Sequence, residues 1–340
     1  MKAFISGCAG TEFTADERSF LRDADPWGLI VFARNVASHD QLRALCDTFR
    51  ETVSDHERPI LIDQEGGRVQ RIKPPLAPAY PSNAEIARSY GAEVARVRRA
   101  VYLLSRLHAF DLQRVGVDVN CSPVLDVPAP DADPVIGTRA YGRTPELVQD
   151  LGRAACDGLL AGGVLPVIKH MPGHGRADAD SHKFMPRVSA PLSKLATRDF
   201  VPFAALADMP LGMTGHIVFE AIDAERPATT SPIVVSEIIR GAIGFDGLLM
   251  SDDMSMNALS GPFGERARDL FAAGCDLALH CNGMFDEMVA VAEATPDLVG
   301  TSLQRSERAL ARRRAPDEAD EHALRAEFHE LTGCDVSLPA

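Results

Sequence analysis

Eight short apolar runs, spaced along most of the 340-residue chain, constrain its fold more than any other feature. They are rich in Val, Ile and Leu, and longer segments with helical periodicity separate them. The runs are residues 3–5, 28–32, 59–62, 117–120, 166–168, 211–214, 247–251 and 277–280. Continuous apolar runs are typical of strands buried on both faces, and their alternation with helices indicates a parallel sheet. Eight such units predict a (β/α)8 barrel, with a doubly wound open sheet as the alternative.

The expected helices are bounded by residues that begin and end helices. They cover residues 40–53, 84–115, 144–161, 231–242 and 262–273. Ser38 precedes the first of them as an N-cap does, and Gly162 follows the helix that ends near Ala161. Because one TIM barrel alone can exceed 250 residues, we expect a single catalytic barrel domain over residues 1–298. Amphipathic segments near the end predict a C-terminal helical extension, residues 299–340, packed on that barrel.

Composition narrows the functional class and the compartment. The net charge of −13 argues against nucleic acid or a membrane as partner, because both attract clusters of Lys and Arg. Seven cysteines, an odd number without CxxC spacing, fit a reducing compartment. The apolar run at residues 3–5 is too short for a signal peptide, and no stretch of 18 apolar residues exists. We therefore expect a cytoplasmic protein, either a monomer or a weak homodimer.

Polar side chains follow most of the predicted strands. Past the third to eighth strands come Asp63, Gln64 and Glu65, then Asp126, Lys169 and His170, His216, Asp252 and Asp253, and His280 and Asn282. In barrels of this type, catalytic residues lie at the C-terminal ends of the strands. Any one of these residues alone is best explained as a structural polar group. Their recurrence at the same end predicts an active site.

The histidine-rich segment from residue 169 to 182 allows several interpretations. In one, His170, His174, His182 and Asp180 bind a metal ion, since imidazole and carboxylate suit zinc. Against it, a Pro-Gly pair separates the first two histidines, and the spacing matches no common zinc pattern. In another, Asp180 orients the ring of His182, which then acts as a general acid. A loop fixed by purely structural histidines is the third alternative.

Two adjacent carboxylates, Asp252 and Asp253, end the seventh apolar run. Neighbouring residues of a strand point to opposite faces, so both cannot face the same way. We expect one carboxylate to face the mouth of the barrel and the other to cap the following helix near Met254. The alternative is that both are caps.

Together, four segments resemble glycoside hydrolase family 3, specifically its bacterial β-N-acetylglucosaminidase branch. They read IDQEGGRVQR at 62–71, IGTRAYG at 136–142, KHMPGHG at 169–175 with DSH at 180–182, and SDDMSM at 251–256. The resemblance covers residues 7 to 282. Tyr141, Met171 and Met254 stand where the family commonly has Phe, Phe and Leu, and these are swaps of similar character.

The resemblance implies a retaining β-N-acetylglucosaminidase that needs neither a cofactor nor a metal. It implies that Asp252 is the nucleophile, His182 the acid/base and Asp180 its partner. The implied sugar-binding residues are Asp63, Arg71, Arg139, Lys169 and His170. The implied substrates are small N-acetylglucosaminyl saccharides, including anhydro-muropeptides from recycled peptidoglycan. A β-glucosidase or β-xylosidase of the same family and an N-acetylglucosaminide phosphorylase are the alternatives.

Overall fold

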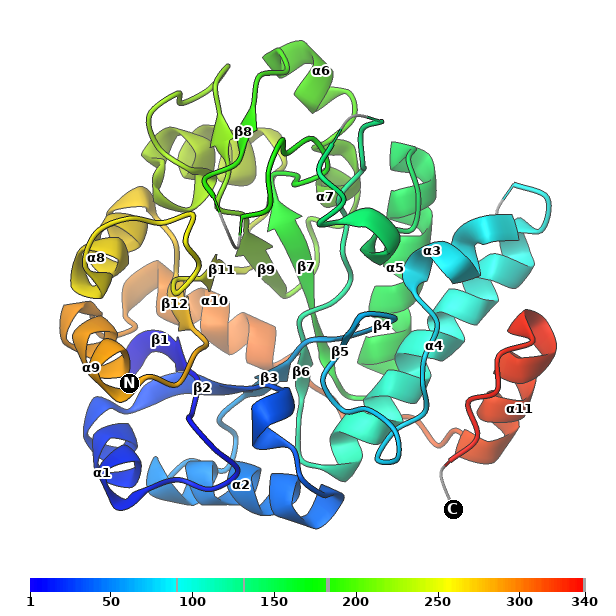
Figure 1. The fold of residues 1–340 in the computed structure, drawn as a ribbon, viewed down its shortest axis with the longest axis horizontal. Helices are drawn as coiled ribbons and strands as arrows, with labels where there is room; N and C mark the ends of the chain where they lie inside the picture. The colour runs from blue at the N-terminus through cyan, green and yellow to red at the C-terminus, as the bar shows by residue number, and fades with distance from the viewer. Residues whose placement is uncertain (90, 131, 182–183, 339–340) are drawn as a thin grey trace.

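Eight parallel strands close into a barrel in the computed structural model, which describes residues 1–89, 91–130, 132–181 and 184–338 (Figure 1). Around the barrel the strand order is β1, β12, β11, β9, β7, β6, β3 and β2. The strands are β1 (Lys2–Ser6), β2 (Pro26–Val31), β3 (Ile60–Ile62), β6 (Val119–Asn120), β7 (Leu165–Met171), β9 (Leu211–Thr214), β11 (Leu248–Asp253) and β12 (Leu277–His280). Each overlaps one of the eight predicted runs. The (β/α)8 prediction is confirmed, and the open-sheet alternative is wrong.

Two apolar layers hold the barrel together, because alternate residues of each strand point to opposite faces. Leu61 faces the cluster inside the barrel, whereas its neighbours Ile60 and Ile62 pack in the outer cluster beneath the helices. The same alternation places Leu165 and Val167 of β7 inside the barrel. The interior is therefore a packed core, and only its C-terminal end is open to polar chemistry.

Helices form a ring around the strands (Figure 1). The longer ones are α1 (Ala15–Ala24), α2 (His39–Thr52), α4 (Val94–Arg114), α5 (Pro145–Ala161), a π-helical segment (Val234–Ala242), α8 (Phe263–Ala273), α9 (Phe285–Ala294), α10 (Gly300–Leu310) and α11 (Glu321–Thr332). Short helices are α3 (Asn83–Ile86), α6 (Leu192–Ala196) and α7 (Val201–Ala205). The single helix expected over residues 84–115 is wrong. Gly91 has a φ of 100°, which an α-helix does not accommodate, so α3 and α4 are separate.

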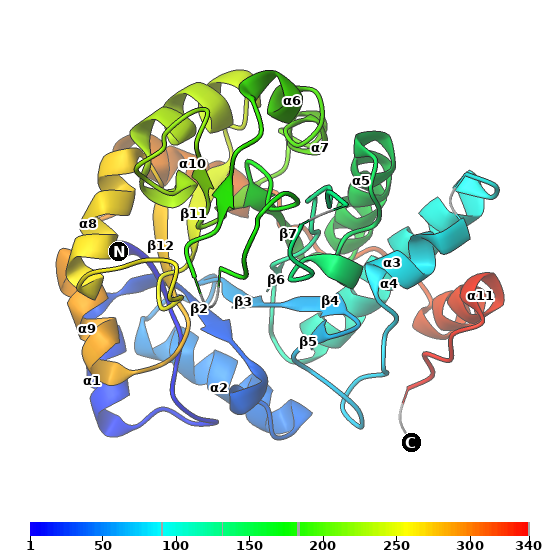
Figure 2. The same cartoon turned by 45° about the horizontal axis from the view of Figure 1, so that its top comes forward.

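The C-terminal segment packs against α4. Helix α11, red in both views, lies beside α4 (Figures 1 and 2). Arg325 of α11 forms an ion pair with the buried Asp111 of α4 at 2.8 Å, and Arg99 pairs with Glu327 at 2.7 Å. Helix α11 is one of the helices within the segment that the sequence predicts to be a C-terminal helical extension. We retain the division into a barrel, residues 1–298, and an extension, residues 299–340, as a proposal.

The loops that follow the strands build one end of the molecule. After β3, the chain forms a two-stranded hairpin from β4 (Gln64–Gly66) and β5 (Val69–Gln70). A second small sheet joins β8 (Arg187–Val188) to β10 (Val218–Phe219). Figure 2 shows the hairpin between β3 and α4, at the rim of the barrel. Within the residues that the structure describes, none of the helices combines the length and apolar character that a membrane span requires.

Candidate active site

A cavity of about 230 Å³ opens at the C-terminal ends of the strands. Pockets for drug-sized ligands usually measure roughly 300–1,000 Å³, so this one suits a smaller group such as a single sugar ring. Residues from seven of the eight barrel strands, or from the loops that follow them, contribute to its lining, including Asp63 after β3, Lys169 on β7, and Asp252 on β11. The expectation that the polar ends of several strands share one site is thus met by the geometry.

Strand alternation explains why these three residues face the cavity. Lys169 stands two residues after Val167, which points into the barrel, and Asp63 stands two residues after Leu61. Asp252 likewise follows Met250 on the inward face of β11. Successive side chains of a strand alternate between faces, so each polar residue continues an inward row at the mouth. The barrel core ends where these charges begin.

The hairpin β4–β5 returns Arg71 to the neighbourhood of Asp63. Gln64 orders the return, since its side-chain oxygen accepts the N–H of Arg71 at 2.9 Å. Gly66 has a φ of 90°, and a Cβ atom there would lie 2.5 Å from the carbonyl oxygen of Pro81. Only glycine fits this turn. As a result, the guanidinium of Arg71 donates to a carboxylate oxygen of Asp63 at 2.8 Å.

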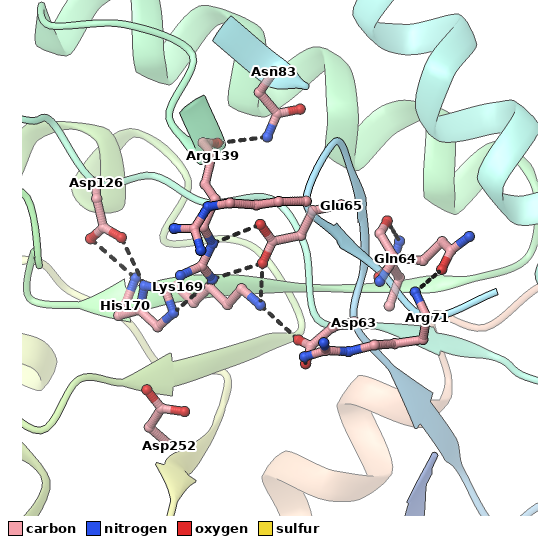
Figure 3. Close-up of polar contacts among 12 residues, drawn as sticks. Asp63, Gln64, Glu65, Arg71, Asn83, Asp126, Arg139, Lys169, His170 and Asp252 are labelled. Atoms are coloured by element: carbon pink, nitrogen blue, oxygen red, sulfur yellow. Dashed lines mark hydrogen bonds and ion pairs between the residues drawn. The ribbon is translucent and has the colours of Figure 1, made fainter. Parts of the chain in front are cut away.

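A buried ionic network joins the hairpin to β7 (Figure 3). Lys169 Nζ lies 2.8 Å from oxygens of both Asp63 and Glu65. Glu65 also accepts two hydrogen bonds from Arg139, at 2.9 and 2.8 Å. Lys169 is 2% exposed, and a cation so deeply buried requires such partners. The network fixes Asp63, Lys169 and Arg139 at the cavity wall and holds Glu65 directly behind them.

The network keeps its carboxylates ionised. Burial raises the pKa of Asp63, but Lys169 and Arg71 outweigh burial and hold it well below its usual value. Burial also raises the pKa of Glu65, yet Arg139 and Lys169 lower it to about 2. Burial lowers the pKa of Lys169, but the two carboxylates raise it above its usual value. At neutral pH all these groups carry charge, so they present fixed, preorganised charges to a polar ligand.

Asp252, which lines the cavity together with its neighbour Asp253, is the carboxylate of β11 that continues the inward row. Its Oδ1 accepts the backbone N–H of Asp253 at 2.8 Å. Burial raises the pKa of Asp252, but His170, His216, the backbone N–H of Asp253 and Lys169 together outweigh burial, so its pKa lies below the usual value. An ionised carboxylate at this position is a competent nucleophile.

Asp253 has a different function from its neighbour. Its carboxylate accepts from Ser255 N–H at 2.9 Å, from Ser255 Oγ at 2.5 Å and from Cys281 N–H at 3.1 Å. It therefore closes a turn and ties β11 to the end of β12. The expectation that it caps a helix near Met254 is wrong, because the next helix, α8, begins only at Phe263. As expected, however, the two carboxylates have different roles: Asp252 continues the inward row of β11, and Asp253 closes the turn.

His170 is held from behind by Asp126, a buried residue that follows β6. His170 Nδ1 lies 2.7 Å from Asp126 Oδ2, and the opposite edge of the ring faces the cavity. Farther along the segment, His174 Nε2 lies 3.1 Å from Ser181 Oγ. Burial lowers the pKa of His174 to about 4, so its ring is neutral at pH 7. Both histidines line the cavity.

The structure brings together most of the residues singled out from the sequence. The cavity is lined by Asp63, Arg71, Arg139, Lys169, His170 and Asp252. His182 lies outside the described residues, and Asp180 is half-buried next to the cavity-lining Ser181. His216 and His280 do not line the cavity: His216 Nδ1 lies 2.8 Å from Thr229 Oγ1, and His280 Nε2 lies 3.1 Å from Glu287. Among the described residues, no three His, Cys, Asp or Glu side chains cluster closely enough to hold a metal ion.

Two residues of the site were not assigned a role from the sequence. Glu65 and Asp126 follow predicted strands, but their partners lie 74 and 44 residues away in the chain. The available signal was an acidic residue near a strand end, in the same row as Asp63. Both are buried carboxylates whose function is to hold cavity-lining side chains.

Comparison with known proteins gives a consistent result. The model for the glycosyl hydrolase family 3 N-terminal domain matches residues 5–311. A β-hexosaminidase of Alkalilimnicola ehrlichii is 39% identical over 285 residues, 82% of this chain and 80% of the relative. A β-hexosaminidase of Methylococcus capsulatus is 40% identical over 277 residues, 80% of each chain.

Solved structures agree. NagZ from Neisseria gonorrhoeae in complex with N-trifluoroacetyl-D-glucosamine aligns with a TM-score of 0.86 and 28% identity, covering 100% of this chain and 98% of that one. A family 3 β-N-acetylglucosaminidase from Paenibacillus aligns with a TM-score of 0.80 and 29% identity, over 99% of this chain and 63% of the longer relative. The chain therefore belongs to glycosyl hydrolase family 3 and is a glycoside hydrolase of the β-N-acetylhexosaminidase type.

Proposed function

We propose that the protein is a retaining β-N-acetylglucosaminidase that removes terminal, non-reducing N-acetylglucosamine. The observation that carries this proposal is the position of Asp252. It lies ionised in a cavity of the size of one sugar ring, with the charged network of Lys169, Glu65 and Arg139 on another wall. Relatives named β-hexosaminidases support the choice of hexosaminide over other glycosides.

Asp252 is suited to attack an anomeric carbon. Its Oδ1 is occupied by the N–H of Asp253, whereas no residue in the described part of the chain hydrogen-bonds its Oδ2. One oxygen is thus oriented and the other is available for bond formation. In a retaining mechanism, this attack gives a covalent glycosyl intermediate, which water then hydrolyses.

The proton transfers are proposed for His182, with Asp180 as its partner. His182 would protonate the leaving oxygen as Asp252 attacks, and would then remove a proton from the attacking water. A carboxylate next to a histidine ring fixes its tautomer and raises its pKa, as a general acid requires.

The sugar is proposed to be bound by the surrounding polar side chains. Asp63 would accept hydrogen bonds from ring hydroxyls, and Lys169 and Arg139 would donate to hydroxyls or to the acetamido oxygen. Arg71 and His170 complete the set. The ion pairs already formed among these groups keep them in place before the sugar arrives, so little reorganisation is needed on binding.

The side chains at the mouth of the cavity favour a substrate whose leaving group is acidic. Arg68 lines the cavity, is exposed, and donates to the carbonyl oxygen of Val135. The other Arg and Lys residues of the lining are each paired with a carboxylate. Within the described residues, Arg68 has no such partner. We propose that it faces a carboxylate-bearing aglycone, such as an anhydro-muropeptide, and that the enzyme acts in cytoplasmic peptidoglycan recycling.

Hydrolysis of 4-nitrophenyl glycosides tests the proposed activity. We expect the N-acetyl-β-glucosaminide to be cleaved with a kcat/KM at least about 100-fold above that of the β-glucoside, because an unmatched polar group strongly disfavours the wrong substrate. Added phosphate should leave the product as free N-acetylglucosamine, formed first as the β-anomer. Equal rates for both glycosides, or N-acetylglucosamine 1-phosphate as the main product, would establish one of the alternatives instead.

A further inference from the structure

Asp126 is fully buried and each of its carboxylate oxygens has its own partners. Oδ1 accepts the backbone N–H of His174 at 2.6 Å and, more weakly, that of His170 at 3.3 Å. Oδ2 lies 2.7 Å from Nδ1 of the His170 ring. The residue is 0% exposed, so it cannot reach a ligand in the cavity. Any effect it has on the reaction must act through the histidine segment.

The partners of the His170 ring select one tautomer. Burial raises the pKa of Asp126, but the interactions with His170 and His174, including the hydrogen bonds to the His170 ring and the His174 N–H, outweigh burial and lower it. The carboxylate is therefore ionised at neutral pH and can only accept. Nδ1 must therefore carry the proton of the Asp126 contact. On the other edge, Nε2 has Arg139 at 3.4 Å, and a guanidinium can only donate. That contact is long, but its direction also requires a lone pair on Nε2.

We propose that Asp126 is a positioning residue that holds His170 with its proton on Nδ1, so that Nε2 faces the cavity as a hydrogen-bond acceptor. In Figure 3, His170 lies between Asp126 and Asp252. The ring would accept from a hydroxyl or amide N–H of the bound sugar, next to the nucleophile. This inference rests on the proposed function, since it assumes that the cavity binds a sugar.

An Asp126→Asn substitution is expected to invert the tautomer without changing side-chain size. Two backbone N–H groups converge on the Oδ1 position, so the amide oxygen of asparagine must occupy it. The amide nitrogen then faces His170 Nδ1 and can only donate. Nδ1 becomes the acceptor, the proton moves to Nε2, and the ring presents a donor to the cavity and to Arg139.

The direct test is ¹⁵N NMR of the full-length protein labelled at histidine, at neutral pH, with His170→Gln used to assign the signal. The wild-type ring should be protonated at Nδ1 and the Asp126→Asn ring at Nε2. Loss of a residue that orients a functional histidine typically lowers activity about 10–100-fold, and we expect that loss in kcat/KM. Asp118→Asn is the matched control. Asp118 immediately precedes the first residue of β6, is also buried, and accepts the backbone N–H of Ile60 at 2.8 Å. This variant should leave both the His170 signal and kcat/KM unchanged.

A wild-type His170 protonated at Nε2, or at both nitrogens, overturns the proposal, and this spectrum needs no variant to fold. A retained Nδ1–H tautomer in Asp126→Asn, or an inverted one with less than a threefold loss of kcat/KM, also overturns it. Failure of the wild-type enzyme to cleave N-acetylglucosaminides would instead refute the proposed function, and it leaves the tautomer measurement intact.

Discussion

Lys169 Nζ lies 2.8 Å from a carboxylate oxygen of Glu65, and both side chains are almost completely buried. The two residues come from β7 and from the hairpin after β3, and they are 104 positions apart in the sequence. A buried cation is stable only when carboxylates surround it, so Lys169 can occupy the cavity wall only because Glu65 pairs with it. The site therefore depends on a residue that does not itself line the cavity.

Replacement of Glu65 by Gln should destabilise the fold and weaken substrate binding. It removes the charge that Arg139 and Lys169 share, and breaking a buried ion pair from one side costs about 3–5 kcal/mol. Urea unfolding should show this loss, and KM for the nitrophenyl N-acetylglucosaminide should rise. Glu220→Gln serves as the control, because Glu220 pairs with Arg187 at the surface, where such a pair contributes about 1 kcal/mol or less. If the two variants behaved alike, the network would have no special role.

The stability of the enzyme should fall on mild acidification, in part because of His108. Burial, followed by the nearby Arg325, lowers the pKa of His108 to about 3, whereas an unfolded histidine titrates near 6.5. The unfolded state therefore binds the proton first. The contribution of neutral His108 to the free energy of unfolding is complete above about pH 6.5, and it is lost progressively as the pH falls toward 3.

His108→Phe measures this contribution, since phenylalanine keeps a ring against Tyr80, whose centroid lies 4.5 Å from that of the imidazole. Between pH 7 and pH 5, the wild type should lose about 2 kcal/mol more of its unfolding free energy than the variant. Denaturant titrations at the two pH values give this difference. Parallel losses in both proteins would mean that His108 is protonated in the folded state.

Arg68 should discriminate between acidic and neutral leaving groups. Arg68→Gln is expected to lower kcat/KM about tenfold for N-acetylglucosaminyl-anhydro-N-acetylmuramic acid, since it removes a charge-assisted hydrogen bond. The same variant should cleave N,N′-diacetylchitobiose within about twofold of the wild-type rate, because that aglycone carries no carboxylate. Higher salt should reduce the wild-type preference. Equal losses on both disaccharides would assign Arg68 a purely structural role.

The fold was predictable because its strands are short, apolar and buried on both faces. All eight runs became strands of the barrel, since both faces of these parallel strands are buried and favour apolar residues. Helix limits were less predictable. Gly91 separates α3 from α4 within a continuous periodic pattern. Helix α1 was not anticipated, although Thr14 and Glu17 form a capping box at its start.

The site was predictable where a residue continues an inward row, as Asp63, Lys169 and Asp252 do. The roles of Glu65 and Asp126 were not, because they depend on partners brought close only by barrel closure. Strand alternation predicted that Asp252 and Asp253 have different roles. The turn that Asp253 closes was not predictable, because it depends on the neighbouring β12. Local pattern identifies which residues face the cavity, and tertiary contacts decide what holds them there.

The claim that Asp252 is the nucleophile is tested most directly by trapping the covalent intermediate. The enzyme would be incubated with an activated, ring-fluorinated N-acetylglucosamine derivative, digested, and examined by mass spectrometry, with Asp252→Asn as the unlabelled control. We predict one sugar per chain, attached to Asp252. A sugar attached to Asp253, or the absence of any adduct together with release of the α-anomer, would contradict the account.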